Sequence, residues 1–207
     1  MIAVVDYGVG NLFSLSSSLR AVGAEVCVSG EEKTLRAADK LVLPGVGAFA
    51  DAAEKLRAGG LDRIVCEEAR KGKPLLGICL GMQLLFEKSY EYGEHRGLGL
   101  IPGCVRPISE VIPSDLKIPH IGWNALRFTE RHKNSLFRYI QEGDFVYFVH
   151  SFAGMDCGAS TIAVAEYGAP LTAAVALGNV YGCQFHPEKS GKVGLSILRA
   201  FCGEACI

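Results

Sequence analysis

Short apolar runs alternate with amphipathic stretches through the first half of the chain, as they do in proteins built from parallel strands and helices. The apolar runs have the length of buried strands, which we predict at Ile2–Asp6, Glu25–Ser29, Lys40–Leu43 and Pro74–Ile78. The amphipathic stretches carry apolar residues at helical spacing, and we predict helices at Leu12–Ala21, Ala50–Ala58, Leu61–Lys71 and Gly81–Ser89. This half therefore predicts a doubly wound sheet of the α/β class, with functional loops after the carboxyl ends of its strands.

The second half of the chain contains many strand-like runs and little helix. We predict strands at Val105–Ile108, Ala125–Phe128, Phe145–His150, Thr161–Glu166, Thr172–Leu177 and Val180–Phe185. Several of them are expected to be antiparallel additions to one mixed sheet, which a helix over Gly191–Phe201 covers. The length of 207 residues and the hydrophobic share of 49% predict a single domain spanning residues 1–207.

The charges of the chain are nearly balanced. There are 21 lysines and arginines against 22 aspartates and glutamates, so we expect no binding to nucleic acid or to an anionic membrane surface. No apolar run approaches the roughly 18 residues of a membrane span, and the first residues predict a strand rather than a basic leader segment. We therefore expect a cytoplasmic chain that does not cross a membrane.

Eight cysteines are scattered among apolar neighbours, and none belongs to a Cys-x-x-Cys pair. This usage is typical of buried thiols in a reducing compartment, and it argues against a disulfide framework. Cys202 and Cys206 could share a helix face, but no histidine or carboxylate pattern completes a ligand set around them. We expect no metal site and no cofactor.

One cysteine stands apart, because Cys79 lies between Gly77 and Gly81 where an apolar run meets a helix-like stretch. This pattern is typical of a nucleophile elbow, a tight turn in which side chains at the flanking positions would collide with the strand or the helix. Backbone N–H groups at the start of the helix would favour the thiolate, and the N–H of Leu80 could donate to an oxyanion. The alternative is a buried structural cysteine in a glycine-rich turn.

A possible base for this thiol lies about a hundred residues further on, at His186, followed by Pro187 and Glu188. A thiol nucleophile needs an imidazole to take its proton, and the imidazole needs an acceptor that fixes its tautomer. Pro187 favours an extended backbone at His186, so the preceding strand should end there and direct both side chains to one rim. His150 is the competing candidate for the base, and a hydrogen-bonded structural histidine is the alternative for either one.

Two glycine-rich loops follow strands of the first half. The run Leu41–Leu43 breaks into a loop from Pro44 to Gly47, so Val46 or Gly47 could donate the second hydrogen bond to an oxyanion. A simple turn is the alternative interpretation. The other loop, Gly8–Gly10, resembles the start of a dinucleotide-binding motif, but Phe13 stands where that motif needs its third glycine.

Together these residues resemble the class I, triad-type glutamine amidotransferases, which use an elbow cysteine and a His-Pro-Glu pair. Within that family the chain is similar to the glutaminase subunits of imidazole glycerol phosphate synthase. The closer resemblance extends over nearly the whole chain and depends on the segments Asp6–Asn11, Pro119–Asn124, Tyr147–Phe152 and Gln184–Ser190. It implies a doubly wound mixed sheet with flavodoxin-like layering.

The resemblance also implies roles for individual residues. Cys79 would be the nucleophile, His186 the base and acid, and Glu188 the residue that orients the imidazole ring. Glutamine would be bound by Gly47, Gln83, Glu91, Ser151 and Phe152. Phe152 departs from the family pattern, in which tyrosine is common at that position, so a hydroxyl contact is not expected there.

The partner implied by the resemblance is a (βα)₈-barrel cyclase subunit that receives ammonia and acts in histidine biosynthesis. A heterodimer, ammonia channelling and allosteric activation would follow, with the enzyme classes hydrolase and lyase. The residues that would face the partner are Asn11, Trp123, Asn124, Tyr147 and Lys189. A core aromatic is the alternative for Trp123, and a helix cap is the alternative for Asn11.

Two other functions fit parts of this pattern. A glutaminase serving pyridoxal phosphate synthesis would also deliver ammonia to a barrel, but it is expected to carry a Gly-Gly-Glu-Ser loop where this chain has Gly45–Ala48. A non-catalytic scaffold relative would be expected to lose the nucleophile or the base, and this chain retains both.

Overall fold

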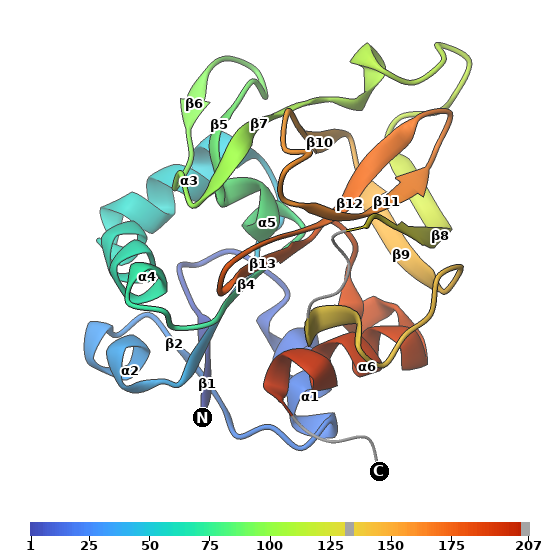
Figure 1. Ribbon diagram of the computed structural model, residues 1–207. Helices are drawn as coiled ribbons and strands as arrows, with labels where there is room; N and C mark the ends of the chain where they lie inside the picture. Colours follow the sequence, from blue (N-terminus) through green and yellow to red (C-terminus); the bar gives the residue numbers. More distant parts are fainter. Residues whose placement is uncertain (131–134, 204–207) are drawn as a thin grey trace.

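A sheet of nine strands forms the centre of the molecule, in the order β2-β1-β3-β4-β13-β12-β11-β8-β9 (Figure 1). The computed structural model of the chain describes residues 1–130 and 135–203, so Cys206 lies outside the described residues. The first four strands are parallel and have the bounds Ile2–Val5 (β1), Val26–Ser29 (β2), Lys40–Leu43 (β3) and Leu75–Ile78 (β4). The prediction of a parallel α/β sheet in the first half is confirmed.

The helices of the first half also agree with the amphipathic pattern. Three of them and the last helix of the chain were predicted, and their bounds are Leu12–Ala21 (α1), Phe49–Ala58 (α3), Leu61–Arg70 (α4) and Gly191–Cys202 (α6). A short helix over Glu32–Ala37 (α2) was not predicted. Asn11 begins α1 as its N-cap, because its side-chain oxygen accepts a hydrogen bond from the backbone N–H of Ser14.

The strands of the second half extend the central sheet, mostly with antiparallel pairing. Their bounds are His120–Phe128 (β8), Phe145–His150 (β9), Thr161–Glu166 (β11), Pro170–Leu177 (β12) and Val180–Cys183 (β13). β13 is the exception, because it lies parallel to β4 with Cys183 opposite Ile78. This pairing places the carboxyl ends of β4 and β13 side by side.

The predicted helix over Gly81–Ser89 is wrong in its second half. The helix α5 covers only Leu80–Leu84, and the chain continues as a strand, Phe86–Ser89 (β5). The backbone N–H groups of residues 98–100 donate to the carbonyls of residues 84–86, the carbonyls that a longer helix would have used. A segment distant in the sequence thus ends the helix by taking its hydrogen-bond acceptors.

The expectation that several of these strands are antiparallel additions to one mixed sheet is confirmed. A second sheet of four strands, in the order β10-β7-β5-β6, is not predicted from the sequence, and β5 belongs to it. Its other strands are His95–Arg96 (β6), Ile101–Pro107 (β7) and Phe152–Met155 (β10), so the strand predicted at Val105–Ile108 lies here. The described part of the chain also contains three short 3₁₀ helices: Ile108–Glu110 (η1), Ser135–Phe137 (η2) and Pro187–Lys189 (η3).

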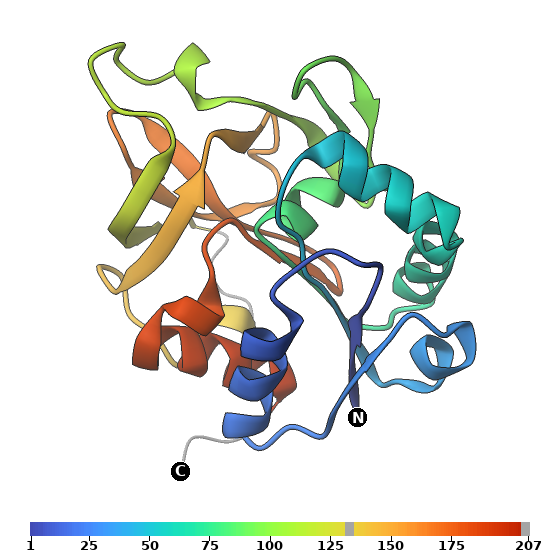
Figure 2. The same ribbon diagram turned by 180° about the vertical axis from the view of Figure 1, so that it is seen from behind.

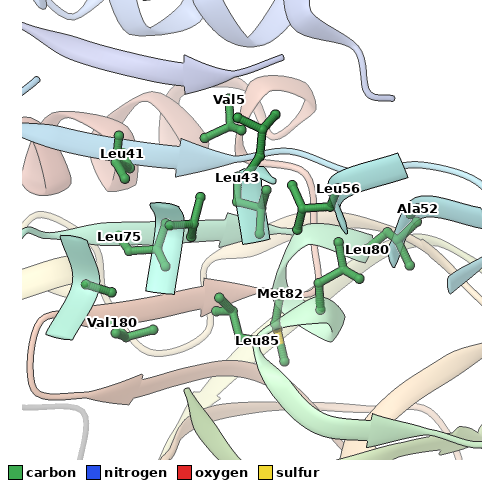
Figure 3. Packing of buried hydrophobic residues seen from close by; sticks show 14 of the residues in the cluster. Val5, Leu41, Leu43, Ala52, Leu56, Leu75, Leu80, Met82, Leu85 and Val180 are labelled. Atoms are coloured by element: carbon green, nitrogen blue, oxygen red, sulfur yellow. The ribbon is translucent and has the colours of Figure 1, made fainter. Parts of the chain in front are cut away.

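Apolar side chains fill both sides of the central sheet. One cluster joins the strands to α2, α3, α4 and α5, and the other joins them to α1 and α6, which lie side by side in Figure 2. Figure 3 shows part of the first cluster, in which side chains of β3 and β4 pack against α3 and α5. This packing holds α5, the helix that follows the elbow residue Cys79, against the carboxyl end of the sheet. Within the described residues 1–130 and 135–203, no helix is long and apolar enough to span a membrane.

A buried carboxylate fixes the chain just before β4. Glu68 is 5% exposed and accepts hydrogen bonds from Arg36, Lys71 and Lys73 at 2.7–2.9 Å. The Lys73 ammonium also donates to the backbone carbonyls of Leu35 and Arg36, and so ties α2 to the segment that leads into β4. The hydrogen bonds from Lys71 and Lys73 lower the pKa of Glu68 to about 2.

We predict that Glu68→Gln lowers the free energy of unfolding at neutral pH by about 2 kcal/mol, since it removes the charge that three cations stabilise. Because its pKa is lowered in the folded state, Glu68 stabilises the fold at pH values above the ordinary glutamate pKa of about 4.3. This contribution is lost as the pH falls toward 2. Urea unfolding over a pH series should therefore show the difference from the parent shrinking below about pH 4. Glu54→Gln, on the exposed face of α3, is the control and should behave as the parent.

Candidate active site

The backbone of Cys79 turns sharply between β4 and α5. Its φ is +55° and its ψ is −112°, a conformation that a non-glycine residue rarely adopts. A Cβ on Gly81 would lie 1.9 Å from the carbonyl oxygen of Leu43, and a Cβ on Gly77 would lie 2.6 Å from the carbonyl oxygen of Gly81. Both glycines are therefore required by close backbone approach, as a nucleophile elbow requires.

The loop from Pro44 to Gly47 packs directly on this elbow. A Cβ on Gly45 would lie 2.7 Å from the backbone nitrogen of Gly81, so only glycine allows the approach. The Tyr7 hydroxyl, from the loop after β1, donates to the carbonyl of Pro44 at 2.7 Å. Loops that follow three neighbouring parallel strands thus meet at one point, as the doubly wound arrangement predicts.

His186 reaches the same point from β13. The backbone N–H of Cys79 donates to the carbonyl of Cys183 at 2.7 Å, which continues the β4–β13 pairing beyond the last paired residues. Nδ1 of His186 lies 2.8 Å from Oε1 of Glu188, and the two side chains are 5% and 4% exposed. The structure therefore brings Cys79, His186 and Glu188 together, with the carboxylate placed to orient the ring.

The electrostatics of this group favour a protonated imidazole. Burial alone would lower the pKa of His186, but its hydrogen bonds with Cys79 and Glu188 raise that pKa to about 9. The arrangement can thus place a sulfur nucleophile and a proton donor in one contact.

The competing base, His150, lies in a different environment. Its Nδ1 is 2.8 Å from the carbonyl oxygen of Phe152, and its Nε2 is 3.0 Å from Nδ1 of His120. Both ring nitrogens are therefore engaged, and burial lowers the pKa of His150 to about 4. A histidine that is neutral and occupied in this way is a poor acceptor for a thiol proton, so the geometry favours His186.

A pocket of about 360 Å³ opens over Cys79. Nine of its lining residues were singled out from the sequence for catalysis or for oxyanion or substrate binding: Val46, Gly47, Cys79, Leu80, Gln83, Glu91, Ser151, Phe152 and His186. His150 also lines it, as do three residues that the sequence did not indicate: Tyr92, Pro119 and Val149. Tyr92 has a positive φ of +53° and meets Phe152 edge-on at 6.1 Å, so the two aromatic rings flank the pocket.

Gln83 and Glu91, two of the predicted substrate-binding residues, are buried, and neither is a solvated helix residue. Gln83 is 5% exposed on α5, and Glu91 is 8% exposed in the turn after β5. Oε2 of Glu91 accepts a hydrogen bond from the backbone N–H of Phe49 at 2.6 Å, which holds the carboxylate in the wall of the pocket. A buried carboxylate beside an open pocket suits a cationic group of a ligand.

The residues expected at a partner interface lie in three places. Trp123 on β8 is 52% exposed and meets Tyr147 of β9 edge-on at 6.0 Å, and the Lys189 ammonium lies 5.8 Å from the Tyr147 ring centre. The side chain of Asn124, next to Trp123, forms hydrogen bonds with His120 and with the backbone carbonyl of Glu166. Asn11 caps α1, as described above. The exposure of Trp123 is inconsistent with the alternative of a core aromatic.

Comparison with known proteins decides the family. The family model described as "Glutamine amidotransferase class-I" matches residues 3–205. The chain belongs to the class I glutamine amidotransferase family. Class I glutamine amidotransferases are enzymes, and an elbow thiol with a histidine–carboxylate pair is the arrangement that acyl transfer requires. The expectation of a lyase is wrong for this chain, because acyl transfer from an amide to water is hydrolysis.

Individual class I amidotransferases agree with this family assignment. The chain is 50% identical to the imidazole glycerol phosphate synthase subunit HisH of Aquifex aeolicus over 96% of its own length and 94% of the relative's. It is 48% identical to the subunit of the same name from Wolinella succinogenes, over 98% of each chain. A solved crystal structure of a glutamine amidotransferase shares the fold, with a TM-score of 0.75 at 19% identity over 98% of each chain.

Titration of His186 followed by NMR should test the electrostatics of this amidotransferase site. We predict a midpoint near pH 9 in the parent, because the imidazolium is stabilised by its two partners. Glu188→Gln should lower the midpoint, since a neutral amide stabilises the imidazolium less than a carboxylate does. His150 is the internal control and should titrate near pH 4 in both proteins. Equal midpoints for His186 in the parent and the variant would contradict this account.

Proposed function

We propose that this chain is the glutaminase subunit of imidazole glycerol phosphate synthase, which hydrolyses glutamine to glutamate and ammonia. The observation that supports it most strongly is the buried His186–Glu188 pair beside the strained elbow thiol of Cys79, under a pocket with a buried carboxylate. The relatives that carry this subunit name match nearly the full length of the chain at 45–50% identity. The proposal treats residues 1–207 as one domain.

The reaction would proceed through a thioester. The Cys79 sulfur attacks the amide carbon of glutamine, and the electron pair of the carbonyl moves to its oxygen. His186 then gives its proton to the amide nitrogen, which leaves as ammonia while the carbonyl re-forms. Next His186 takes a proton from water, and the hydroxide attacks the thioester carbon. The carbon–sulfur bond then breaks with its electron pair returning to the sulfur beside protonated His186, and the new carboxyl group of glutamate loses its proton to water.

Hydrogen-bond donors for the oxyanion would come from two loops. The N–H of Leu80 belongs to the elbow itself, and Val46 or Gly47 would supply the second donor. Val46 and Gly47 line the pocket over Cys79, and they also line a second hollow of about 290 Å³ on the side of Gly8–Gly10. Space on both sides of this loop would allow the peptide before Val46 to turn its N–H toward the site or away from it.

Glutamine would place its amino group against Glu91, the buried carboxylate of the pocket, and its carboxamide over Cys79. Phe152 and Ser151 would form the opposite wall. Phe152 has no hydroxyl, so this wall would bind through its backbone and its ring. Gln83 holds that backbone in place, because its Nε2 donates to the carbonyl of Phe152 at 3.1 Å.

The outer face of β8 and β9 suits the docking of a cyclase subunit. Three apolar residues of these strands are more than half exposed: Ile121, Trp123 and Phe145. They lie on one face, because residues two apart on a strand point the same way and Trp123 pairs with Tyr147. Ile121 is opposite Val149, which lines the pocket, so a partner on this face would lie beside the site where ammonia forms. An exposed apolar patch with an aromatic centre is typical of a protein interface.

The other functions considered from the sequence have less support. A glutaminase for pyridoxal phosphate synthesis would not be expected to match subunits named for imidazole glycerol phosphate synthase at this identity and coverage. A scaffold relative would have no need for a strained cysteine beside a buried His–Glu pair. We also propose a cytoplasmic location, since the thiols of Cys79 and Cys183 are free and suit a reducing compartment.

Cys79→Ala should abolish glutamate release from glutamine, because the thioester cannot form. We expect a loss of about 10⁴-fold or more, measured in the presence of the cyclase subunit. The same complex supplied with ammonium salt should retain the synthase reaction, and titration calorimetry should show that the variant still binds the cyclase subunit. Parent-like release of glutamate by the variant would exclude Cys79 as the nucleophile.

Trp123→Ala should weaken binding of the cyclase subunit by about 30-fold, as expected when an interface aromatic is removed. Titration calorimetry measures the binding, and glutamate release measures the activation of the glutaminase that goes with it. Leu177→Ala is the matched control, because Leu177 is a 46%-exposed apolar residue at the β12–β13 turn, away from β8 and β9. Equal binding by the Trp123 and Leu177 variants would contradict the proposed docking face.

A further inference from the structure

We propose that Gln184 is a positioning residue for the nucleophile, and that its side-chain amide directs an N–H group at the sulfur of Cys79. Nε2 of Gln184 lies 3.9 Å from Sγ of Cys79. The inference rests on the proposed function only in taking Cys79 as the reacting group. No role in the reaction was assigned to Gln184 from the sequence, because an amide at the end of an apolar strand carries no pattern of its own.

The burial of Gln184 is the first argument. Its side chain is 0% exposed between β13 and His186, in a position where an apolar residue would cost less to desolvate. A buried amide is tolerated only when its oxygen and its nitrogen both have partners. Here the oxygen accepts from Nε2 of Gln83 at 3.0 Å, and the sulfur of Cys79 is the partner of the nitrogen.

The orientation of the amide follows from its neighbours. Nε2 of Gln83 faces the backbone carbonyl of Phe152 at 3.1 Å, and a carbonyl can only accept, so this end of the Gln83 amide must be the NH₂ group. The same NH₂ group faces Gln184, and therefore the atom it meets there must be the oxygen. The remaining end of the Gln184 amide, which points at Cys79, is then the donor.

His150 fixes the other end of this chain of hydrogen bonds. The Phe152 carbonyl also accepts from Nδ1 of His150 at 2.8 Å, which makes Nε2 the accepting nitrogen of a neutral His150. Nδ1 of His120 lies 3.0 Å from that nitrogen. Nε2 of His120 lies 2.7 Å from Oδ1 of Asn124, whose NH₂ group donates to the carbonyl of Glu166, so both ring nitrogens of His120 face acceptors and a neutral His120 can donate to only one of them. From His150 through the Phe152 carbonyl and Gln83 to Gln184, each donor has an acceptor. If the Gln184 amide were reversed, its NH₂ group would face the NH₂ group of Gln83, and neither donor would have an acceptor at this contact.

The chemical consequence is a donor held ready for negative charge on sulfur. A hydrogen bond to the charged form of a group favours that form, and His186 supplies the matching positive charge on another side. A separation of 3.9 Å is long for such a bond, as catalytic hydrogen bonds commonly are before substrate binds. The same chain secures the Phe152 carbonyl, so the pocket wall and the nucleophile are positioned together.

The test is the pH dependence of Cys79 alkylation by iodoacetamide, followed by mass spectrometry. Gln184→Met keeps the length of the side chain but removes the donor, and we expect alkylation of Cys79 at neutral pH to slow about tenfold. The curve should move to higher pH. Gln184→Glu replaces the donor by oxygen atoms and should slow the reaction further. Cys27, half-buried on β2 at the far edge of the sheet, is the internal control and should react as in the parent.

A side chain with a merely structural role would change the thermal stability and leave the pH curve of Cys79 unmoved. A parent-like curve in Gln184→Met would therefore overturn the proposal. If that variant does not fold, the parent provides the measurement: the side-chain amide NMR resonances of Gln184 should shift as Cys79 ionises and should not shift over the same pH range in Cys79→Ala. An absence of this difference would also overturn it. Neither measurement uses glutamine, so the result is independent of whether the chain is a glutaminase.

Discussion

The left-handed backbone of Cys79 is the constraint on which the rest of the site depends. Such a conformation costs about 1–3 kcal/mol in a residue with a side chain, and it persists only where the surroundings hold it. Three features hold it here. Gly77 and Gly81 have no room for a Cβ, the loop after β3 packs on the turn, and the N–H of Cys79 donates to the backbone at the end of β13. This backbone conformation directs the Cys79 thiol into the pocket.

The parallel pairing of β4 with β13 converts this local turn into a site. Two strands that are a hundred residues apart in sequence end side by side, so the residues that follow them meet: Cys79 from one strand, Gln184 and His186 from the other. All three are nearly buried, and a low local dielectric strengthens every interaction among them. The raised pKa of His186 and the lowered pKa of His150 show that two histidines near one pocket can be held in opposite states.

Local patterns predicted much of this molecule, and contacts between distant segments account for the rest. The α1 helix has the bounds that its apolar spacing and the Asn11 cap indicate. The apolar spacing of Gly81–Ser89 predicts a helix, but Phe86–Ser89 is a strand because the backbone N–H groups of residues 98–100 donate to the carbonyls that a longer helix would use. The elbow is predicted because two glycines flank a cysteine where a strand-like run meets a helix-like one. The hydrogen-bond chain from His150 to Gln184 depends on side chains that only the folded chain brings together.

The central claim is that Cys79 attacks the carboxamide of a glutamine bound in the pocket above it. Labelling with a diazoketone analogue of glutamine tests it most directly, because the reagent must occupy the glutamine site before it can alkylate the thiol there. We predict that mass spectrometry finds one label per chain, on Cys79, and that an excess of glutamine prevents it. Labelling of another cysteine, or labelling of Cys79 that glutamine does not slow, would contradict the account.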